Sequence, residues 1–152
     1  MGVARVELNS PFTFFRRDAG VSPTVALSLR RNNGVLYVGS EEGVRRLVPA
    51  PGAKARFEPV PGGGARVFAL LSYDESLLVG TIAGLARITG GSQRLEVRTP
   101  VPVLGLGRSI SSPDRIFVGF PNSLVTYLQT TAGGWIDEGP IKGFYGRGAD
   151  TA

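Results

Sequence analysis

The stretch LYVGSEEGVRRL (residues 36–47) contains two apolar strands around a short polar loop, with Gly43 where a tight turn favours glycine. Nearly the same phrase returns as LLVGTIAGLARI (77–88) and as IFVGFPNSLVTYL (116–128). The first strand of each phrase ends in a glycine, and these glycines are Gly39, Gly80 and Gly119. They are 41 and 39 residues apart, so each period of about 40 residues is expected to form one supersecondary unit.

Composition favours many short strands joined by turns over a helical bundle. The chain has 152 residues, the length of one domain, with 42% hydrophobic residues, 22 glycines and 11 prolines. Its apolar runs fall short of the roughly 18 residues that a membrane-spanning helix needs. The first ten residues carry Arg5 and Glu7 where a signal peptide has its apolar run, so we expect no export signal.

Histidine and cysteine are both absent from the sequence. The usual general base, a Ser-His-Asp triad, a cysteine nucleophile and thiolate metal sites are therefore excluded within this chain. We expect no enzyme activity, no metal and no cofactor. The net charge of +5 comes from isolated pairs of basic residues, without a dense run interleaved with aromatic residues, so nucleic acid is not an expected partner.

Each repeat predicts four short strands separated by turns rich in glycine, asparagine and proline. The first repeat predicts strands at 24–30, 35–40, 43–48 and 55–60. The second predicts strands at 66–72, 77–81, 84–89 and 94–99. The third predicts strands at 101–107, 115–120, 123–129 and 135–139. In the first of these strands Val25, Leu27 and Leu29 alternate, which places them on one face.

The second strand of each repeat is apolar on both faces, and such a strand belongs in the middle of a sheet that is covered on both sides. The fourth strand mixes Arg and Glu into its pattern, which is typical of an outer strand. An apolar inner region with a charged outer edge, repeated in this way, indicates the blade of a β-propeller. Leucine-rich repeats have a shorter period, helical repeats lack this density of glycine and β-branched residues, and a sandwich does not need one phrase three times.

We therefore expect an all-β fold, a partial β-propeller of about three four-stranded blades. The expected divisions are an N-terminal extension (1–11), an outer strand of a preceding blade (12–17), blades at 21–62, 63–100 and 101–140, and a patternless tail (141–152). Propellers typically have about four to eight blades, so three cannot close a ring. Further blades in a longer parent chain are the expected way to complete it, and a ring assembled from several chains is the alternative.

The repeated phrase resembles the two-component regulator propeller repeat. The core of that repeat is an aromatic or aliphatic pair, then Val-Gly-Thr or Val-Gly-Ser, two variable residues, and Gly-Leu or Gly-Val before a basic or polar strand. The first two phrases and the lead-in RRDAGVSPTVALSLRRNNGVLYVGS are similar to it, and the likeness covers roughly residues 12 to 140. The third phrase departs from it with Phe120-Pro121-Asn122-Ser123, where Asn122 is expected to take a left-handed conformation that keeps the hairpin.

This resemblance implies the sensor region of bacterial membrane-bound regulators such as histidine kinases, hybrid kinases and cyclic-nucleotide cyclases. The implied function is a non-catalytic ligand-sensing or interaction module, in a periplasmic or otherwise extracytoplasmic place, as a fragment of a longer sensor. Its partner would be an unknown small ligand or protein. The alternative is a protein–protein interaction scaffold with no signalling output.

Several residues stand out as candidate sites, and most have an expected structural role. The repeated glycines lack the spacing of a phosphate-binding loop and are expected to supply turns with positive φ. These glycines are Gly39, Gly43, Gly80, Gly84 and Gly119. The adjacent carboxylates Glu41-Glu42 and Asp137-Glu138 do not by themselves make a catalytic pair or a cation site, because neighbours on a strand point opposite ways, and they are expected in solvated loops. Trp135, the single tryptophan, is expected to pack over the next blade.

The loops that join second to third strands should open at the same end of a propeller as the loops that lead into each blade. Their chemistry differs from repeat to repeat, being acidic, then apolar, then aromatic and amide. Variable loops on a regular frame are where recognition tends to lie. We therefore expect a ligand or partner rim formed by Ser40, Glu41, Glu42, Thr81, Phe120 and Asn122.

Overall fold

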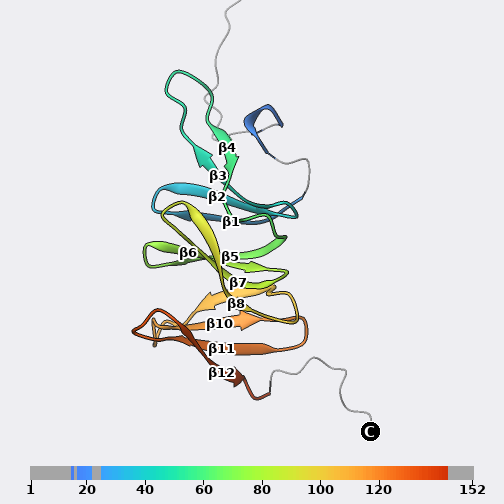
Figure 1. Cartoon of the computed structure of the whole chain (residues 1–152), viewed down its shortest axis with the longest axis vertical. Coiled ribbons are helices and arrows are strands. Elements are labelled where there is room, and N and C mark those ends of the chain that lie inside the picture. Colours follow the sequence, from blue (N-terminus) through green and yellow to red (C-terminus); the bar gives the residue numbers. More distant parts are fainter. Residues whose placement is uncertain (1–14, 16, 22–24, 144–152) are drawn as a thin grey trace, which may run out of the picture.

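The computed structural model describes residues 15, 17–21 and 25–143, which form three antiparallel sheets of four strands each (Figure 1). A short 3-10 helix, η1 (Arg17–Ala19), precedes the sheets. The first sheet contains β1 (Ala26–Asn32), β2 (Val35–Ser40), β3 (Gly43–Val48) and β4 (Arg56–Pro59). The second contains β5 (Val67–Tyr73), β6 (Ser76–Thr81), β7 (Gly84–Thr89) and β8 (Ser92–Arg98). The third contains β9 (Gly105–Arg108), β10 (Arg115–Gly119), β11 (Leu124–Gln129) and β12 (Trp135–Pro140).

The strand order within each sheet follows the chain, so every sheet is a simple meander. All twelve strands expected within the three repeats are present, and their boundaries differ from the expected ones by four residues at most. The turn between β1 and β2 has φ angles of 46° at Asn33 and 78° at Gly34, the conformation that an Asn-Gly hairpin favours. The prediction of an all-β chain built from four-stranded units is therefore confirmed.

The three sheets stack in chain order along the long axis of the molecule (Figure 1). Their first strands lie beside one another, with β1 next to β5 and β5 next to β9. Side chains bond across the first of these contacts: Nε of Arg30 donates to the carbonyl of Leu70 at 3.3 Å, and Oγ of Ser72 donates to the carbonyl of Arg31 at 3.3 Å. Equivalent strands of successive repeats therefore meet along one side of the stack.

Two apolar clusters fill the spaces between the sheets. The cluster between the first and second sheets consists of Val44, Val60, Val67, Leu70, Leu77, Val79, Ala86 and Ile88. The cluster between the second and third sheets consists of Leu71, Tyr73, Leu78, Leu85, Val103, Ile116, Val118, Val125 and Tyr127. Removal of this apolar surface from water is the main stabilising term that holds the sheets together.

The middle sheet is covered on both faces, and all six residues of β6 are buried. The expectation that second strands lie in the interior therefore holds in full for β6. β2 and β10 are only partly buried, because another described sheet covers just one face of each. The first and third sheets thus each keep a face that no other described sheet covers.

Gly39, Gly80 and Gly119 do not have the turn role expected of them, because they lie within strands and do not have positive φ. A Cβ added at Gly80 would lie 2.8 Å from both Cγ1 and the carbonyl oxygen of Val103, and one at Gly39 would lie 2.5 Å from Cγ1 of Val67. At these two positions glycine permits the close approach of the next sheet. At Gly119 the nearest atom would be 3.5 Å away, which is an ordinary contact.

The turn glycines proper are Gly43 and Gly84, whose φ angles of 114° and 135° agree with the expected role. Asn122 does not have the left-handed conformation expected of it. The third hairpin closes instead through a backbone bond in which the N–H of Phe120 donates to the carbonyl of Ser123 at 2.8 Å. The hairpin prediction is confirmed, and the reason given for it is wrong.

The outer strand expected at 12–17 lies mostly outside the described residues, as do the extension at 1–11 and the tail from 144. The two described residues of the expected outer strand, Phe15 and Arg17, are not in a strand. The ring of Phe15 packs edge-on against Phe57 of β4, with centroids 5.1 Å apart, and Arg17 begins η1. None of the helices that the structure describes is long and apolar enough to cross a membrane.

Candidate functional site

The turns that join second to third strands lie beside the segments that lead into the next sheet. The N–H of Val44 donates to the carbonyl of Gly63 at 3.2 Å, and the N–H of Val103 donates to the carbonyl of Thr81 at 3.0 Å. The turns and the lead-in segments therefore lie together at the same end of the strands. The rim is defined here as residues 40–43, 60–66, 81–84, 99–104 and 120–123.

Ser40 and Thr81 occupy the same place in the first two turns, and they are only 3% and 1% exposed. In each turn the hydroxyl donates to the carbonyl of the turn glycine, at 3.2 Å in the first turn and 2.9 Å in the second. The same hydroxyl accepts from the N–H two residues further on, at 3.2 Å and 3.1 Å. These side chains hold the turns in shape and do not offer their hydroxyls to a ligand.

The two glutamates of the first turn bind different arginines. Oε1 of Glu41 lies 2.6 Å from Nη2 of Arg66, which joins the turn to the segment that leads into the second sheet. Oε2 of Glu42 lies 3.6 Å from Nη2 of Arg45 in the same hairpin. Both carboxylates are about half exposed and do not converge on a common point, so the first turn presents two separate ion pairs to solvent.

The third turn divides its predicted site residues between core and solvent. Phe120 is half-buried and packs against the cluster between the second and third sheets. Asn122 is exposed at the tip of the turn. Of the predicted rim residues, Glu41, Glu42 and Asn122 are therefore the ones whose side chains face solvent.

Three apolar side chains at the rim were missed by the sequence reasoning. Ile82, Val101 and Leu104 are 52%, 42% and 42% exposed. Ile82 lies in the second turn, and the other two lie on the lead-in segment that the hydrogen bond between Val103 and Thr81 joins to it. The available signal was an apolar residue at the variable position of a polar turn, as at Ile82. The rim thus changes from paired charges to apolar side chains and then to an amide.

Asp137 and Glu138 lie in β12 and not in the solvated loop expected for them. Glu138 binds Arg115 through two bonds, 2.6 Å from Nε and 2.8 Å from Nη2, and Oδ1 of Asp137 accepts from the N–H of Gly139 at 2.8 Å. The hydrogen bond from Arg115 lowers the pKa of Glu138, and the same bond raises the pKa of Arg115. The two carboxylates thus bind separate partners and do not form a paired site.

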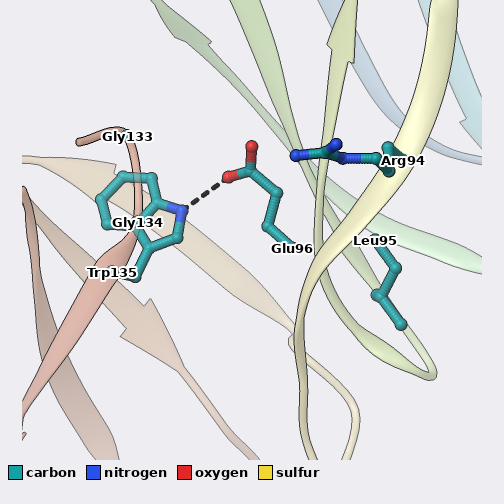
Figure 2. A pocket seen from close by; sticks show the side chains of 6 residues that line it. All are labelled: Arg94, Leu95, Glu96, Gly133, Gly134 and Trp135. Atoms are coloured by element: carbon teal, nitrogen blue, oxygen red, sulfur yellow. Dashed lines mark hydrogen bonds between the residues drawn. The ribbon is translucent and has the colours of Figure 1, made fainter.

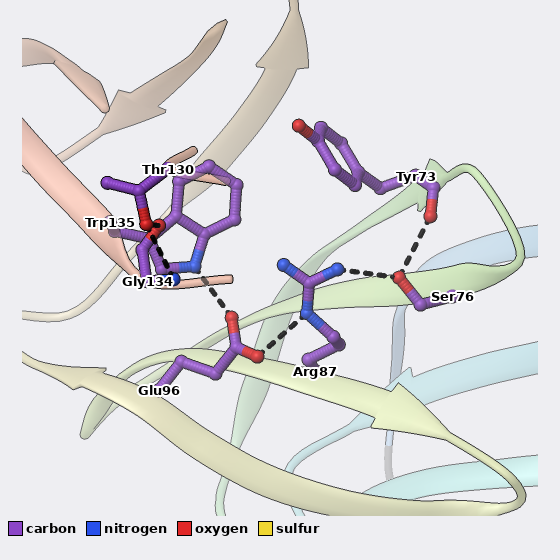
Figure 3. A network of polar contacts seen from close by, with 7 residues as sticks. All are labelled: Tyr73, Ser76, Arg87, Glu96, Thr130, Gly134 and Trp135. Carbon is purple, nitrogen blue, oxygen red and sulfur yellow. Dashed lines mark hydrogen bonds and ion pairs between the residues drawn. The ribbon is translucent and has the colours of Figure 1, made fainter. Parts of the chain in front are cut away.

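A second group of polar side chains lies between the second and third sheets (Figure 3). Glu96 on β8 accepts from Nε of Arg87 at 2.7 Å and from Nε1 of Trp135 at 2.6 Å. Nη1 of Arg87 also donates to Oγ of Ser76 at 3.0 Å. Trp135 therefore packs against the preceding sheet and not over a following one, so its expected packing role holds with the direction reversed.

Aromatic rings and guanidinium groups stack in the same place. The rings of Tyr73 and Trp135 meet edge-on with centroids 5.7 Å apart. The guanidinium carbon of Arg108 lies 4.3 Å from the centroid of Tyr73, and that of Arg87 lies 5.4 Å from it. Burial raises the pKa of Tyr73, which is 1% exposed. We term Tyr73, Arg87, Glu96, Arg108 and Trp135 the junction cluster.

A hollow of about 170 Å³ opens beside the junction cluster (Figure 2). It is lined by Arg94, Leu95, Glu96, Gly133, Gly134 and Trp135. Ligand pockets usually enclose about 300 to 1,000 Å³, so this hollow is small for one. The bond between Glu96 and Trp135 spans it, which makes it a feature of the contact between two sheets.

In the described part of the chain, no three carboxylate side chains come together in a way that could hold a metal ion. The sequence matches no protein-family model and none of the curated proteins. A proposal for the function therefore rests on the geometry of the sheets and of the rim.

Proposed function

We propose that this chain is a non-catalytic ligand-sensing or interaction module that recognises its ligand or partner at the rim. The observation that carries the proposal is the contrast within the turns. Buried hydroxyls hold the first two turns in one shape, while the exposed residues beside them change from glutamates to Ile82 and, in the third turn, to Asn122. A constant frame with variable exposed tips is the usual arrangement of a recognition surface.

In this proposal the three sheets are consecutive blades of a β-propeller, at residues 21–62, 63–100 and 101–140. In a propeller, four-stranded sheets surround a central channel. Its support here is that β1, β5 and β9, the first strands of the sheets, lie beside one another. The fourth strands β4, β8 and β12 are at the opposite edges.

The family resemblance suggests what such a module would serve. In a longer parent protein of the two-component regulator type, it would be part of an extracytoplasmic sensor propeller. A ligand or neighbouring domain that binds the rim would favour one packing of the propeller against its downstream linker over another. Any kinase or cyclase activity would belong to that parent.

The second candidate is a protein–protein interaction scaffold without signalling output. The exposed apolar side chains of Ile82, Val101 and Leu104 at the rim favour it, because such side chains are typical of protein contacts. A parent gene that encodes no membrane helix and no transmitter domain would support the scaffold. A parent that encodes both would support the sensor.

The rim is tested by a variant that combines Glu41→Gln, Glu42→Gln and Asn122→Ala. A panel of single amino acids, monosaccharides and short peptides is added one compound at a time, and the melting temperature is followed. A compound that binds the folded chain raises this temperature. We expect each such compound to lose its effect on the rim variant.

The matched control changes three exposed residues in turns at the opposite end of the sheets, with Glu75→Gln, Ser111→Ala and Asp114→Asn. We expect this control to respond to the same compounds as the unaltered chain. Equal responses of all three proteins would place binding away from the rim and contradict the proposal. A panel without any response, followed by capture of a protein partner that the rim variant loses, would favour the scaffold.

A further inference from the structure

The first and third sheets each have an apolar face that no other described sheet covers. At β4, residues of the same chain lie against this face of the first sheet, because Phe15 packs on Phe57 and Gly20 accepts a bond from Arg45. We term the face of a sheet toward the preceding sheet its leading face, and the face toward the following sheet its trailing face. The leading face of the first sheet carries Leu29, Leu36, Val38 and Leu47. The trailing face of the third sheet carries Phe117, Leu124, Leu128 and Ile136.

The leading face of the first sheet follows from the alternation of side chains along β2. Tyr37 packs against the cluster that the first sheet shares with the second. Its neighbours Leu36 and Val38 therefore point the other way. Leu29 is the direct partner of Val38 across the strand pair, so it lies on the same face.

The trailing face of the third sheet follows from the same rule along β10 and β11. Ile116 and Val118 are fully buried against the second sheet, so Phe117 between them points away from it. Val125 is also buried in that cluster, and its neighbour Leu124 therefore points away.

The leading face of the first sheet has the residues of a face that is made to be covered. A shift of 41 residues along the repeat places Leu29 on Leu70 and Val38 on Val79. Leu70 and Val79 are 6% and 0% exposed, because the first sheet covers them. Leu29 is 64% exposed. The same apolar pattern is thus buried in the second sheet and open in the first.

The trailing face of the third sheet shows the complementary case. A shift of 39 residues places Phe117 on Leu78 and Leu124 on Leu85. Leu78 and Leu85 are both 0% exposed, because the third sheet covers them. Their counterparts in the third sheet are only partly buried. Each open face therefore carries the same apolar pattern as a face of the second sheet that a neighbouring sheet covers.

We propose that two copies of this chain close a ring of six sheets. The trailing face of the third sheet in each copy packs on the leading face of the first sheet in the other copy. A two-fold axis satisfies both contacts at once, and six blades fall within the range of about four to eight that propellers have. The inference rests on the blade arrangement of the proposed function, takes the assembled ring in place of further blades from a parent chain, and does not depend on binding at the rim.

Two charged side chains near the faces already have partners, whereas the exposed Arg31, opposite Leu36 on the leading face, bonds only to the carbonyl of Gly34. Arg45 on the leading face is bound to Glu42 and donates to the carbonyl of Gly20 at 3.1 Å. Arg115 on the third sheet is bound to Glu138. Covering Arg45 and Arg115 leaves each of these two charges with a partner, which avoids the cost of burying an unpaired ion.

The test is the mass of the full chain in solution, measured by light scattering during gel filtration from about 1 to about 100 µM, a range that spans moderate dissociation constants. The proposal expects twice the mass of one chain. Leu29→Lys on the leading face and Phe117→Lys on the trailing face should each raise the dissociation constant by at least about a hundredfold, because both contacts contain both faces. Leu124→Lys is a second trailing-face variant, in case Phe117→Lys does not fold.

The matched control is Ile110→Lys, because Ile110 is fully exposed in the turn between β9 and β10 and lies on neither face. It should keep the mass of the unaltered chain. Circular dichroism and the emission of Trp135 show whether each variant is folded.

Mixing the two face variants separates this ring from other dimers. A copy with Leu29→Lys keeps its trailing face, and a copy with Phe117→Lys keeps its leading face. The mixture therefore restores one unaltered contact and should recover a dimer that neither variant forms alone. In a dimer built from two leading faces, Phe117→Lys alone would still dimerise, and that result would overturn the proposal.

A folded monomer throughout this concentration range, or an assembly larger than two copies, would also overturn it. Neither result would affect the rim, which the binding variants test separately. A failure of the blade arrangement itself would appear in the distances between labelled strands described at the end of the Discussion.

Discussion

A missing Cβ at Gly39 and Gly80 determines how closely the next part of the chain approaches the middle of a sheet. The sequence shows that these glycines repeat, but it does not show what lies against them. Besides Ser28 on the neighbouring strand, the atoms that exclude a side chain belong to Val67 and Val103, which are more than 20 residues away along the chain. Such contacts between distant residues are not visible in a local pattern, which is why the turn explanation failed.

Replacing Gly80 by alanine should destabilise the fold. The new Cβ would meet the backbone oxygen of Val103 at 2.8 Å, and overpacking of this kind costs about 1–3 kcal/mol. The measurement is the free energy of unfolding in urea. Gly119→Ala is the control, because its Cβ has no neighbour nearer than 3.5 Å. Equal losses in the two variants would contradict this explanation of Gly80.

The ion pair of Glu138 and Arg115 should make stability depend on pH. The hydrogen bond from Arg115 holds the pKa of Glu138 below its ordinary value of 4.5. The pair therefore contributes stability above about pH 4.5, and this contribution is lost as the pH falls through the lowered pKa of the folded state.

We accordingly expect Glu138→Gln to lower the melting temperature at neutral pH and to have a smaller effect as the pH falls below about 4.5. Melting curves of both proteins across this range measure the difference. Glu75→Gln, in the exposed turn between β5 and β6, is the control. A melting-temperature difference that stayed constant down to pH 3 would contradict the assignment.

At the scale of strands and sheets, the two spaces between the sheets are held in different ways. The space between the first and second sheets combines an apolar cluster with bonds from Arg30 and Ser72 to main-chain carbonyls. The junction cluster instead places a carboxylate, two guanidinium groups and two aromatic rings beside the second apolar cluster. Glu96 is central to the junction cluster, because it binds both Arg87 of its own sheet and Trp135 of the next.

Glu96→Ala should therefore loosen the contact between the second and third sheets. Arg87 and Glu96 are only 15% and 12% exposed, and removing one partner of such a pair costs roughly 3 kcal/mol. Trp135 is the single tryptophan, so its emission reports on this contact alone and should shift with the loss. Glu96→Gln keeps an acceptor and should lose less.

Glu58→Ala, an exposed site on β4 in the first sheet, is the control and should leave the emission unchanged. Unchanged emission and stability in Glu96→Ala would show that the contact between the sheets does not depend on the junction cluster.

Local patterns predicted the strands well and predicted their partners poorly. The Asn33-Gly34 turn and the alternation within each repeat are properties of neighbouring residues, and the twelve strands expected within the three repeats formed. The bond between Glu96 and Trp135 joins residues 39 positions apart on two sheets. Which face of a sheet meets which neighbour depends on packing in three dimensions, so the direction of Trp135 was predicted wrongly.

At the scale of the whole molecule, the repeat length predicted three like sheets in chain order, with the rim turns together at one end of the strands. It did not separate the side chains that build the rim from those that face solvent. Ser40 and Thr81 read as polar surface residues, yet their hydroxyls are used within the turns. The second turn was expected to be apolar, but Ile82, Val101 and Leu104 were not singled out, because a lone apolar residue in a turn or lead-in segment has no periodic pattern.

The central claim is that the sheets fan out from one axis as propeller blades. Since the chain has no cysteine, introduced cysteines carry spin labels at chosen sites only. One doubly labelled chain carries them at Leu27 on β1 and Leu104 before β9, and a second carries them at Glu58 on β4 and Asp137 on β12. Each is diluted with unlabelled chain, and the distance between its two labels is measured by pulsed electron resonance. Blades around an axis predict a clearly longer distance for the outer pair than for the inner pair, and equal distances would contradict the propeller arrangement.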